Sequence, residues 1–211
     1  MTSQIDLPVT RFYSGDMPAS HWLGDDESKP APDPLSRIQA LVNTIEMPEG
    51  QDRLADPGEA RPWLVAHGLL RSDSELPADD LALVRGVREA LREMLVHNAG
   101  GPPPTAAALA PLREVAGDGT ASAVLDEKGE ILLSATGDTV SGRLIELLLV
   151  IRDAQRDGTW ARLKACGNNE CQWAFYDRSR NHGGTWCDMS SCGNKLKNRE
   201  FRARKRGAPS S

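Results

Sequence analysis

The sequence predicts an α+β protein: a mainly helical N-terminal domain with one β-hairpin, followed by a small cysteine-rich unit that ends in a basic helix. Apolar residues recur at helical spacing over most of residues 35–157. Residues 120–135 alternate instead, and turn at a polar Asp-Glu-Lys-Gly stretch, which is typical of a hairpin. All four cysteines of the chain lie close together near the C-terminal end.

These cysteines form two C-x4-C pairs, Cys166/Cys171 and Cys187/Cys192. Two closely spaced pairs suit a tetrahedral Zn²⁺ site, and four thiolates leave no open coordination position, so such a zinc is structural. Two disulfides are the alternative, but a disulfide scaffold is expected in a short secreted chain. This chain has 211 residues and no predicted signal peptide. We therefore predict a four-cysteine zinc finger with one structural Zn²⁺, in which neighbouring glycines such as Gly167 and Gly193 allow tight turns.

Three motifs make this unit specific: C-G-N-N-E-C at 166–171, D-R-S-R-N at 177–181 and W-C-D-M-S-S-C-G-N-K at 186–195. They resemble the CGNR zinc finger over residues 160–206, with Lys195 in place of the arginine that ends the family's name. Lysine keeps the charge but lacks the planar fork that binds phosphate or guanine in a bidentate manner. The resemblance implies a transcriptional regulator, usually with a sensor-like N-terminal domain called ABATE.

The net charge of −5 is unevenly distributed. Residues 160–211 contain 11 Lys/Arg and 4 Asp/Glu, whereas residues 1–159 contain 14 and 26. A basic end on an acidic body is expected where that end meets a polyanion such as DNA. The alternative is a basic tail that folds back on the acidic domain.

A final helix is expected from about Gly193 to Lys205, with its N-terminus at Cys192, where the helix dipole favours a thiolate. Lys195, Arg199, Arg202 and Arg206 share one face of this helix, which fits a major groove, although a solvated face is the alternative. Asn194 and Asn198 are candidates for reading a base edge. The predicted nucleic-acid-binding residues are Arg178, Arg180, Lys195, Lys197, Arg199, Arg202 and Arg206.

A small core of aromatic side chains is expected around the metal, because a zinc module is too short to build a core without it. Trp173, Phe175 and Trp186 are assigned to this core. Asp177 is predicted to pair with Arg180 or with an arginine of the final helix.

The N-terminal domain is expected to contain five helices, near residues 34–45, 57–67, 78–98, 105–115 and 138–157. Asp33 is predicted to cap the first helix, and the last is expected to form the centre of the core. The helix over 78–98 has one apolar stripe. Its predicted solvated side contains Arg85, Arg88, Glu89, Arg92 and Glu93. Because an isolated hairpin is marginally stable, the hairpin is expected to lie on the helices or to extend a small sheet.

Short motifs, L-V-N-T at 41–44, D-R-L at 52–54 and W-L-V-A-H-G-L at 63–69, resemble the opening of ABATE domains. The resemblance implies a ligand pocket shaped by Asn43 and Thr44; the alternative is that Asn43 only ends a helix. The predicted organisation is a flexible, acidic and proline-rich lead-in over 1–34, an ABATE-like sensor domain over 35–158 and the zinc finger over 160–206.

These observations favour a DNA-binding transcriptional regulator whose N-terminal domain senses a small molecule or mediates dimerisation. One finger offers little contact area, so a homodimer is expected. No apolar run is long enough to span a bilayer, which predicts a cytoplasmic protein without membrane contact. None of the four histidines lies in a recognisable catalytic setting, so no enzyme is expected. The alternatives are a zinc-stabilised protein-interaction module and an RNA-binding protein.

Overall fold

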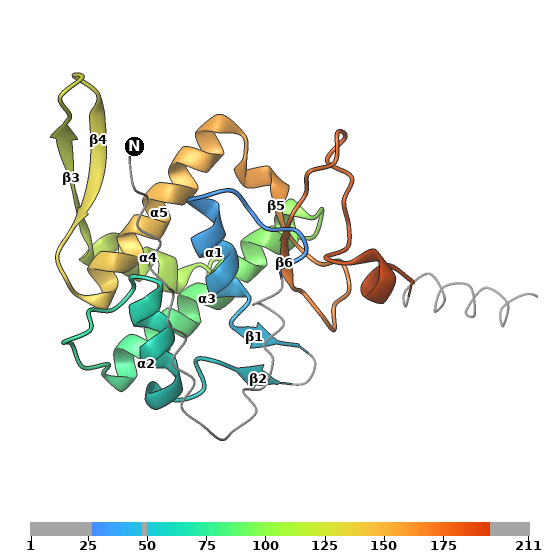
Figure 1. Ribbon diagram of the computed structural model, residues 1–211, viewed down its shortest axis with the longest axis horizontal. Coiled ribbons are helices and arrows are strands. Elements are labelled where there is room, and N and C mark those ends of the chain that lie inside the picture. The colour runs from blue at the N-terminus through green and yellow to red at the C-terminus, as the bar shows by residue number, and fades with distance from the viewer. Residues whose placement is uncertain (1–26, 48–49, 195–211) are drawn as a thin grey trace, which may run out of the picture.

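The computed structural model describes residues 27–47 and 50–194, and within them the predicted α+β organisation is confirmed (Figure 1). The helices are α1 (Leu35–Val42), α2 (Pro57–Ala66), α3 (Ala78–Asn98), α4 (Ala110–Asp118) and α5 (Val140–Asp157). The antiparallel strand pairs are β1 (Ile45–Glu46) with β2 (Gln51–Asp52), β3 (Thr120–Leu125) with β4 (Ile131–Thr136), and β5 (Leu163–Ala165) with β6 (Ala174–Tyr176). Short helical turns span Trp160–Arg162 and Met189–Gly193.

Some predictions concern other parts of the chain. The lead-in up to residue 26 and the basic segment from Lys195 onward lie outside the described residues. The predicted final helix can therefore be followed only as far as Asn194. The turn before it begins at Met189 rather than at Cys192, because Asp188 caps it by accepting a hydrogen bond from the Ser191 amide at 2.8 Å.

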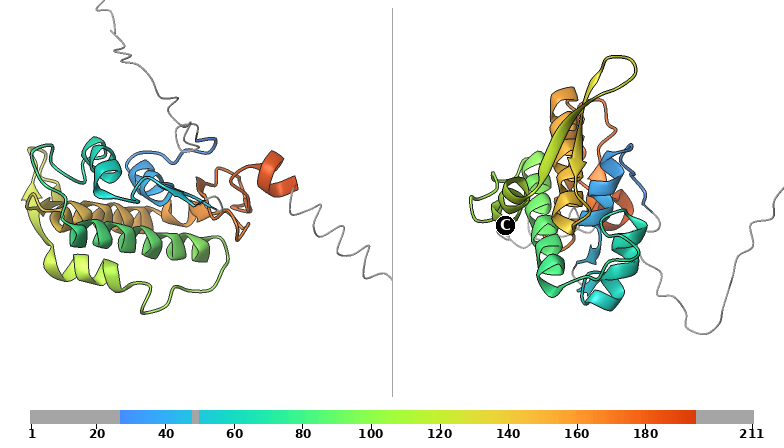
Figure 2. Two further views of the ribbon diagram at one scale, coloured as in Figure 1. Left: turned by 90° about the horizontal axis from the view of Figure 1, so that it is seen from below. Right: turned by 90° about the vertical axis from the view of Figure 1, so that its left-hand side faces the viewer.

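The two long helices α3 and α5 lie side by side at the centre of the N-terminal part (Figure 2). Their apolar stripes, predicted from helical spacing, face one continuous core that α1 also contacts. The fully buried side chains at its centre include Ile38, Leu41, Leu91, Leu95, Leu144 and Leu147. The core therefore has two central helices, and not α5 alone.

The helix ends show where local chemistry was read correctly. Asp56 caps α2 by accepting hydrogen bonds from the amides of Gly58 and Glu59, and Thr139 caps α5, which begins close to the predicted start near residue 138. Gly68 stops the segment after α2 with φ of +71°.

Two predicted helix starts are wrong. The N-cap of α1 is Pro34, and the Asp33 carboxylate accepts a hydrogen bond from the Ser36 hydroxyl instead of from a backbone amide. Helix α4 begins at Ala110 rather than at Thr105, because residues 106–109 form turns that precede it.

The predicted solvated side of α3 is also wrong at two positions. Arg88 and Arg92 are each only 4% exposed. Arg88 forms a bidentate ion pair with Asp52 on β2, at 2.6 and 2.9 Å. Arg92 donates to the carbonyl oxygens of Val42 and Gln172. Helical spacing placed both side chains correctly on the polar face, but β2 and the zinc-finger segment cover that face.

The β3–β4 hairpin was predicted to rest on the helices or to join a sheet. Instead it pairs only with itself within the described residues, and it projects beyond the helical body, with only its base near α5 (Figures 1 and 2). Eleven of its twelve strand residues are exposed. The prediction that the hairpin lies on the helices therefore holds only at its base, and it extends no larger sheet among the described residues.

Candidate metal centre

The metal centre is built on the β5–β6 pair. Its strands align Leu163 with Tyr176 and Ala165 with Ala174, and the pairing continues where the Cys166 amide donates to the Trp173 carbonyl at 2.9 Å. The loop between the strands contains the first cysteine pair. Asn168 closes this loop because its carbonyl accepts hydrogen bonds from the amides of Cys171 and Gln172. A local hairpin therefore brings the first two sulfurs together.

The second cysteine pair returns to the same point. The Gly167 amide donates to the Thr185 carbonyl at 2.8 Å, which places Cys187 beside the first loop. The four Sγ atoms all lie within 4.8 Å of one another, with Cys171–Cys187 at 3.7 Å and Cys187–Cys192 at 3.8 Å. A tetrahedral site with Zn–S distances of about 2.3 Å has sulfur–sulfur edges of about 3.8 Å. The cluster thus has the dimensions of a zinc site and not of two disulfides.

The chemistry of the four thiols also fits a cation. Hydrogen bonds from Cys171 and Cys187 lower the pKa of Cys166, whereas the hydrogen bond with Cys166 raises the pKa of Cys171 to about 12. Four thiolates this close cannot all ionise without a counter-charge. Zn²⁺ supplies that charge when bound, and Asn168 stands behind the site with its Nδ2 donating to the Cys192 Sγ at 3.7 Å.

Two family models match the chain. Residues 36–156, more than half of its length, match ABATE, whose description is "Putative stress-induced transcription regulator". The chain belongs to the ABATE family. Residues 162–205 match the CGNR zinc finger, so both resemblances predicted from the sequence are confirmed. No curated protein matches the chain. Together with the sulfur geometry, the match identifies the four-cysteine cluster as a site for one structural Zn²⁺. We refer to residues 36–156 as the ABATE region and to residues 162–205 as the CGNR finger.

Two glycines of the CGNR finger lie where no side chain would fit. A Cβ at Gly167 would lie 2.9 Å from the Thr185 side chain, and a Cβ at Gly184 would lie 2.6 Å from an Asp177 carboxylate oxygen. Neither residue has a positive φ. The tight turns expected at these glycines are therefore not their only reason, because close packing also leaves no room for a side chain at Gly167 and Gly184.

Asp177 was predicted to pair with Arg180 or with an arginine of the final helix. It pairs instead with Lys164 among the described residues, and the arginines of the final helix lie outside them. The Lys164 Nζ lies 2.9 Å from the Asp177 carboxylate, and both residues are buried. Burial by itself raises the pKa of Asp177, but hydrogen bonds from Lys164, Ser179 and the Gly184 amide outweigh it and lower the pKa. The pair ties β5 to the loop that precedes Cys187. The lysine was missed because strand alternation alone did not show that both sides of β5 are covered.

The aromatic prediction agrees with the structure. Trp173 and Phe175 are buried among the cysteines in a second hydrophobic cluster, and Trp186 packs against it half-buried. This cluster is separate from the large core, whereas Leu163, Ala165 and other residues of β5 and β6 belong to the large core. The same two strands therefore join the metal centre to the ABATE region.

The ABATE region holds the CGNR finger through the end of α1. The Asn43 side chain accepts a hydrogen bond from the Ala174 amide at 2.7 Å and donates to the Ala174 carbonyl at 3.0 Å. Gln39, one turn earlier, donates to the same carbonyl. Asn98 at the end of α3 donates to the carbonyls of Trp160 and Leu163. Asn43 thus ends its helix, which was the alternative reading, and also fixes strand β6.

Replacing Asn43 by alanine tests this contact. Asn43→Ala removes both hydrogen bonds to Ala174 and leaves the buried Ala174 amide without the Asn43 acceptor. We therefore expect a loss of about 1–3 kcal/mol in the free energy of unfolding. Urea denaturation of the zinc-loaded chain measures it. Asn169→Ala is the control, since Asn169 is exposed in the finger, and we expect a change within about 0.5 kcal/mol. Equal stability of the two variants would contradict the assigned role.

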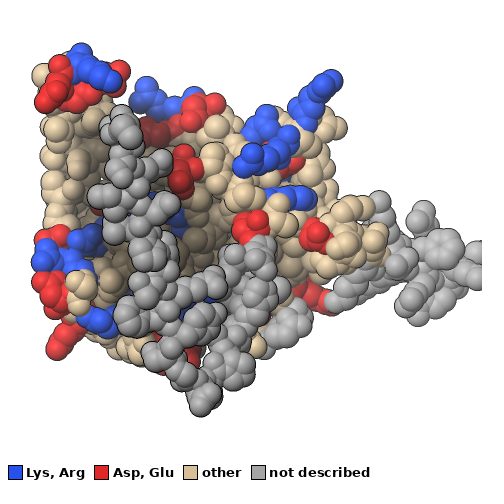
Figure 3. Space-filling model, in the orientation of Figure 1, with Lys and Arg blue, Asp and Glu red and all other residues tan. Residues whose placement is uncertain are grey.

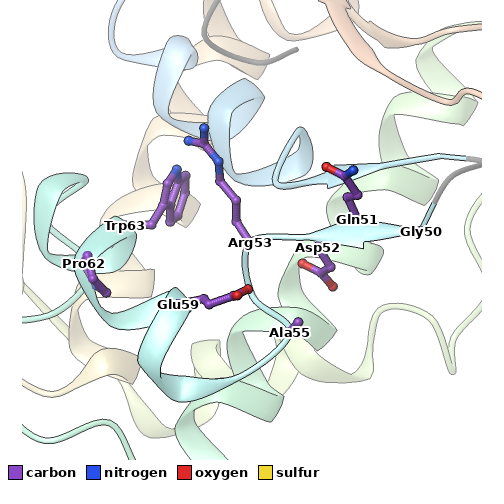
Figure 4. Close-up of a pocket in the computed structure, with 8 residues that line it drawn as sticks. All are labelled: Gly50, Gln51, Asp52, Arg53, Ala55, Glu59, Pro62 and Trp63. Atoms are coloured by element: carbon purple, nitrogen blue, oxygen red, sulfur yellow. The ribbon is translucent and has the colours of Figure 1, made fainter. Parts of the chain in front are cut away.

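The Thr44 side chain also forms its hydrogen bonds within the protein. It is buried, its hydroxyl donates to the Leu41 carbonyl, and it accepts a hydrogen bond from Arg88. A cavity of about 860 Å³ lies between β2 and α2 (Figure 4), and neither Asn43 nor Thr44 lines it. The residues lining this cavity are Gly50, Gln51, Asp52, Arg53, Ala55, Glu59, Pro62 and Trp63.

A chain of ion pairs, buried at Arg88 and Arg92 but exposed at Glu89, connects the wall of this cavity with the first cysteine loop. Asp52 in the cavity wall binds Arg88, Arg88 binds Glu89, and Glu89 binds Arg92. Arg92 then donates to the carbonyl of Gln172, the residue after the metal ligand Cys171. Burial alone lowers the pKa of Arg88, but the hydrogen bond and charge of Asp52 outweigh it and raise the pKa. Arg88 therefore remains charged inside the protein.

Of the predicted nucleic-acid-binding residues, the structure describes Arg178 and Arg180, and both are exposed on the loop between the cysteine pairs. Arg178 is partly engaged, because its guanidinium donates to the Pro30 carbonyl at 2.9 Å and lies 5.9 Å from the Tyr176 ring centre. Asn194 is exposed as well. The remaining candidates lie beyond the described residues. No helix within 27–47 and 50–194 is long and apolar enough to cross a membrane.

Proposed function

We propose that this chain is a DNA-binding transcriptional regulator in which the CGNR finger contacts DNA and the ABATE region receives a signal. The observation that supports this most is the joining of two features in one segment. Residues 160–211 contain both the structural metal site and 11 Lys/Arg against 4 Asp/Glu. The ABATE description, a transcription regulator, agrees with this.

In this proposal the metal site positions the basic segment. Cys192 is held in the capped turn Met189–Gly193, and the basic residues begin two positions after that turn. A fixed turn gives the basic segment that follows it a fixed starting point. Their positive charges displace counterions from phosphates, which gives affinity for nucleic acid of any sequence. Exposed Arg180 adds a further cation from the neighbouring loop. Because a closed four-sulfur site has no open position, the proposal includes no catalysis.

The sensing role belongs to the same proposal. Its support is the cavity beside β2 and the ion pairs that run from its wall, through the half-exposed Glu89, to the first cysteine loop. A ligand that changes the position of Asp52 would act on Arg88, and through it on the contact with Gln172. The expected result is a DNA affinity that changes with an effector, and titrations repeated with pools of small polar molecules test it.

The experiment compares two double variants of the full, zinc-loaded chain in binding to a labelled DNA duplex. Arg199→Ala/Arg202→Ala removes two cations from the basic segment, and we expect affinity to fall at least tenfold at low salt. Arg113→Ala/Arg156→Ala removes the same charge from exposed positions on α4 and α5, and we expect little change. Unchanged zinc content and circular dichroism confirm that both variants are folded.

Each outcome decides between the alternatives. Equal losses in both variants would show that only net charge matters and would contradict a dedicated surface. No binding by the wild-type chain to DNA, but binding to RNA, would favour the RNA-binding alternative. No binding to either polymer would favour a zinc-stabilised protein-interaction module.

A further inference from the structure

The β3–β4 hairpin has an apolar face that is exposed except at Ala135, which packs partly against the chain's own core at the base of the hairpin. Opposite residues in an antiparallel pair point to the same side, as do every second residues along a strand. The register aligns Ala121 with Ala135, Ala123 with Leu133 and Leu125 with Ile131, so these six residues form one face, which is apolar throughout. Among the described residues, six large hydrophobic side chains are strongly exposed, and five of them belong to this hairpin.

The opposite face is different in character. It consists of Thr120, Ser122, Val124, Leu132, Ser134 and Thr136, and its two threonine hydroxyls bond to each other at 2.6 Å. On the apolar face Leu125 and Ile131 are 68% and 74% exposed and Leu133 is 41% exposed, whereas Val124 and Leu132 on the polar face are 47% and 50% exposed. The most exposed large side chains therefore lie on the face that has no hydroxyl groups.

The hairpin also lacks the usual protection of an exposed strand pair. Neither strand contains a proline, a lysine or any other charged residue, although prolines and charged residues normally prevent exposed strands from associating. Charge gathers instead at the turn, where Asp126, Glu127, Lys128 and Glu130 lie, and around Asp138 at the base (Figure 3). The uncharged strands between these two ends match a partner that is itself apolar.

We infer that the apolar face of the β3–β4 hairpin is a homodimer interface, with the hairpin of a second copy packed antiparallel against it. Side chains become larger along this face, from alanines at the base to Leu125 and Ile131 near the turn. An antiparallel overlap places the large residues of one copy over the exposed Ala121 and Ala123 of the other, and such alternation of large and small side chains fills space well. Two-fold symmetry makes the fit reciprocal.

Charge selects the same arrangement. The turn segment has three acidic residues and one lysine, a net charge of −2. A parallel overlap would bring two such turns together, whereas the antiparallel overlap separates them by the length of the strands, about 20 Å. A stable dimer commonly buries about 800 Å² on each partner, which is more than one face of a short hairpin offers. We therefore expect a micromolar dissociation constant rather than a nanomolar one.

The test is sedimentation velocity of the full, zinc-loaded chain over about 1–200 µM, a range that brackets micromolar association. We expect the wild-type chain to pass from monomer to dimer. Leu125→Ser/Ile131→Ser is expected to weaken association at least tenfold. Val124→Ser/Leu132→Ser makes the same chemical change at the neighbouring register on the polar face, and it is expected to leave the dimer nearly intact. Thermal unfolding and zinc content check that both variants keep their fold.

Three results would overturn the inference. A wild-type chain that stays monomeric throughout the range leaves a different protein as the occupant of this face. A dimer that survives Leu125→Ser/Ile131→Ser must form elsewhere. Equal weakening by both double variants points to pairing through a strand edge and not through the apolar face. None of these results depends on DNA binding, so the inference and the proposed function can fail separately.

Discussion

Removal of zinc is expected to unfold the CGNR finger and to destabilise the ABATE region with it. Three of the four cysteines are buried, and all four belong to or pack against the small hydrophobic cluster with Trp173 and Phe175. That cluster is too small to stay folded without the metal, and structural Zn²⁺ contributes about 10–16 kcal/mol to the folding of zinc-finger peptides. Strands β5 and β6 also complete the large core, so their loss exposes part of it.

Hydrogen exchange measures this directly. After chelation, we expect amides of residues 163–192 to lose protection, while those at the centre of α3 and α5 remain protected but exchange faster. Cys187→Ser is the matched variant, because it removes one ligand with little change in volume. Cobalt substitution provides the control for geometry, since tetrahedral thiolate ligation gives strong visible absorption bands. Unchanged protection in the finger after complete metal removal would contradict a structural zinc.

The second large effect is expected at the buried ion pair between Asp52 and Arg88. Asp52→Ala leaves the guanidinium of Arg88, whose side chain is 5% exposed, without its bidentate partner. Removing one member of a fully buried pair costs about 3–5 kcal/mol. Because Arg88 keeps its contact with Glu89, we expect a loss near the lower end of this range. Urea denaturation of the zinc-loaded chain measures the loss.

Two comparisons make this prediction specific. Glu146→Gln breaks the surface pair with Arg37, whose side chains are 42% and 32% exposed, and we expect a change of about 0–1 kcal/mol. The double variant Asp52→Leu/Arg88→Met removes both charges and is expected to be more stable than Asp52→Ala alone. If Asp52→Ala costs no more than Glu146→Gln, Arg88 is not held in the way that the structure indicates.

The metal site was predictable because its information is local. Two C-x4-C pairs specify four ligands whatever surrounds them, and the sulfur distances follow from short loops. The helices were predictable for the same reason, since the apolar stripe of α3 and the Thr139 cap of α5 are short-range patterns. The predicted helix starts were wrong where a local turn precedes the helix, as at Asp33 and before Ala110.

Long-range contacts were not predictable from one sequence. Asn43 meets Ala174 across 131 positions of the chain, and no local pattern distinguishes it from an ordinary helix end. Arg88 and Arg92 occupy the polar face of α3, and only the arrival of β2 and the finger segment buries them. For the β3–β4 hairpin the error was the opposite one, because residues expected to lie against the helices are exposed. Its alternation was read correctly, but the alternation does not say whether the cover comes from the same chain.

The most direct test of the proposed function is the salt dependence of DNA binding by the zinc-loaded chain, measured beside a metal-free sample. We predict that the logarithm of the binding constant falls linearly with the logarithm of salt concentration, by about 0.9 for each phosphate contacted. We also predict that binding is lost when the metal is removed. Absence of binding at low salt, with zinc present and the fold intact, would contradict the account, as would binding that persists unchanged without the metal.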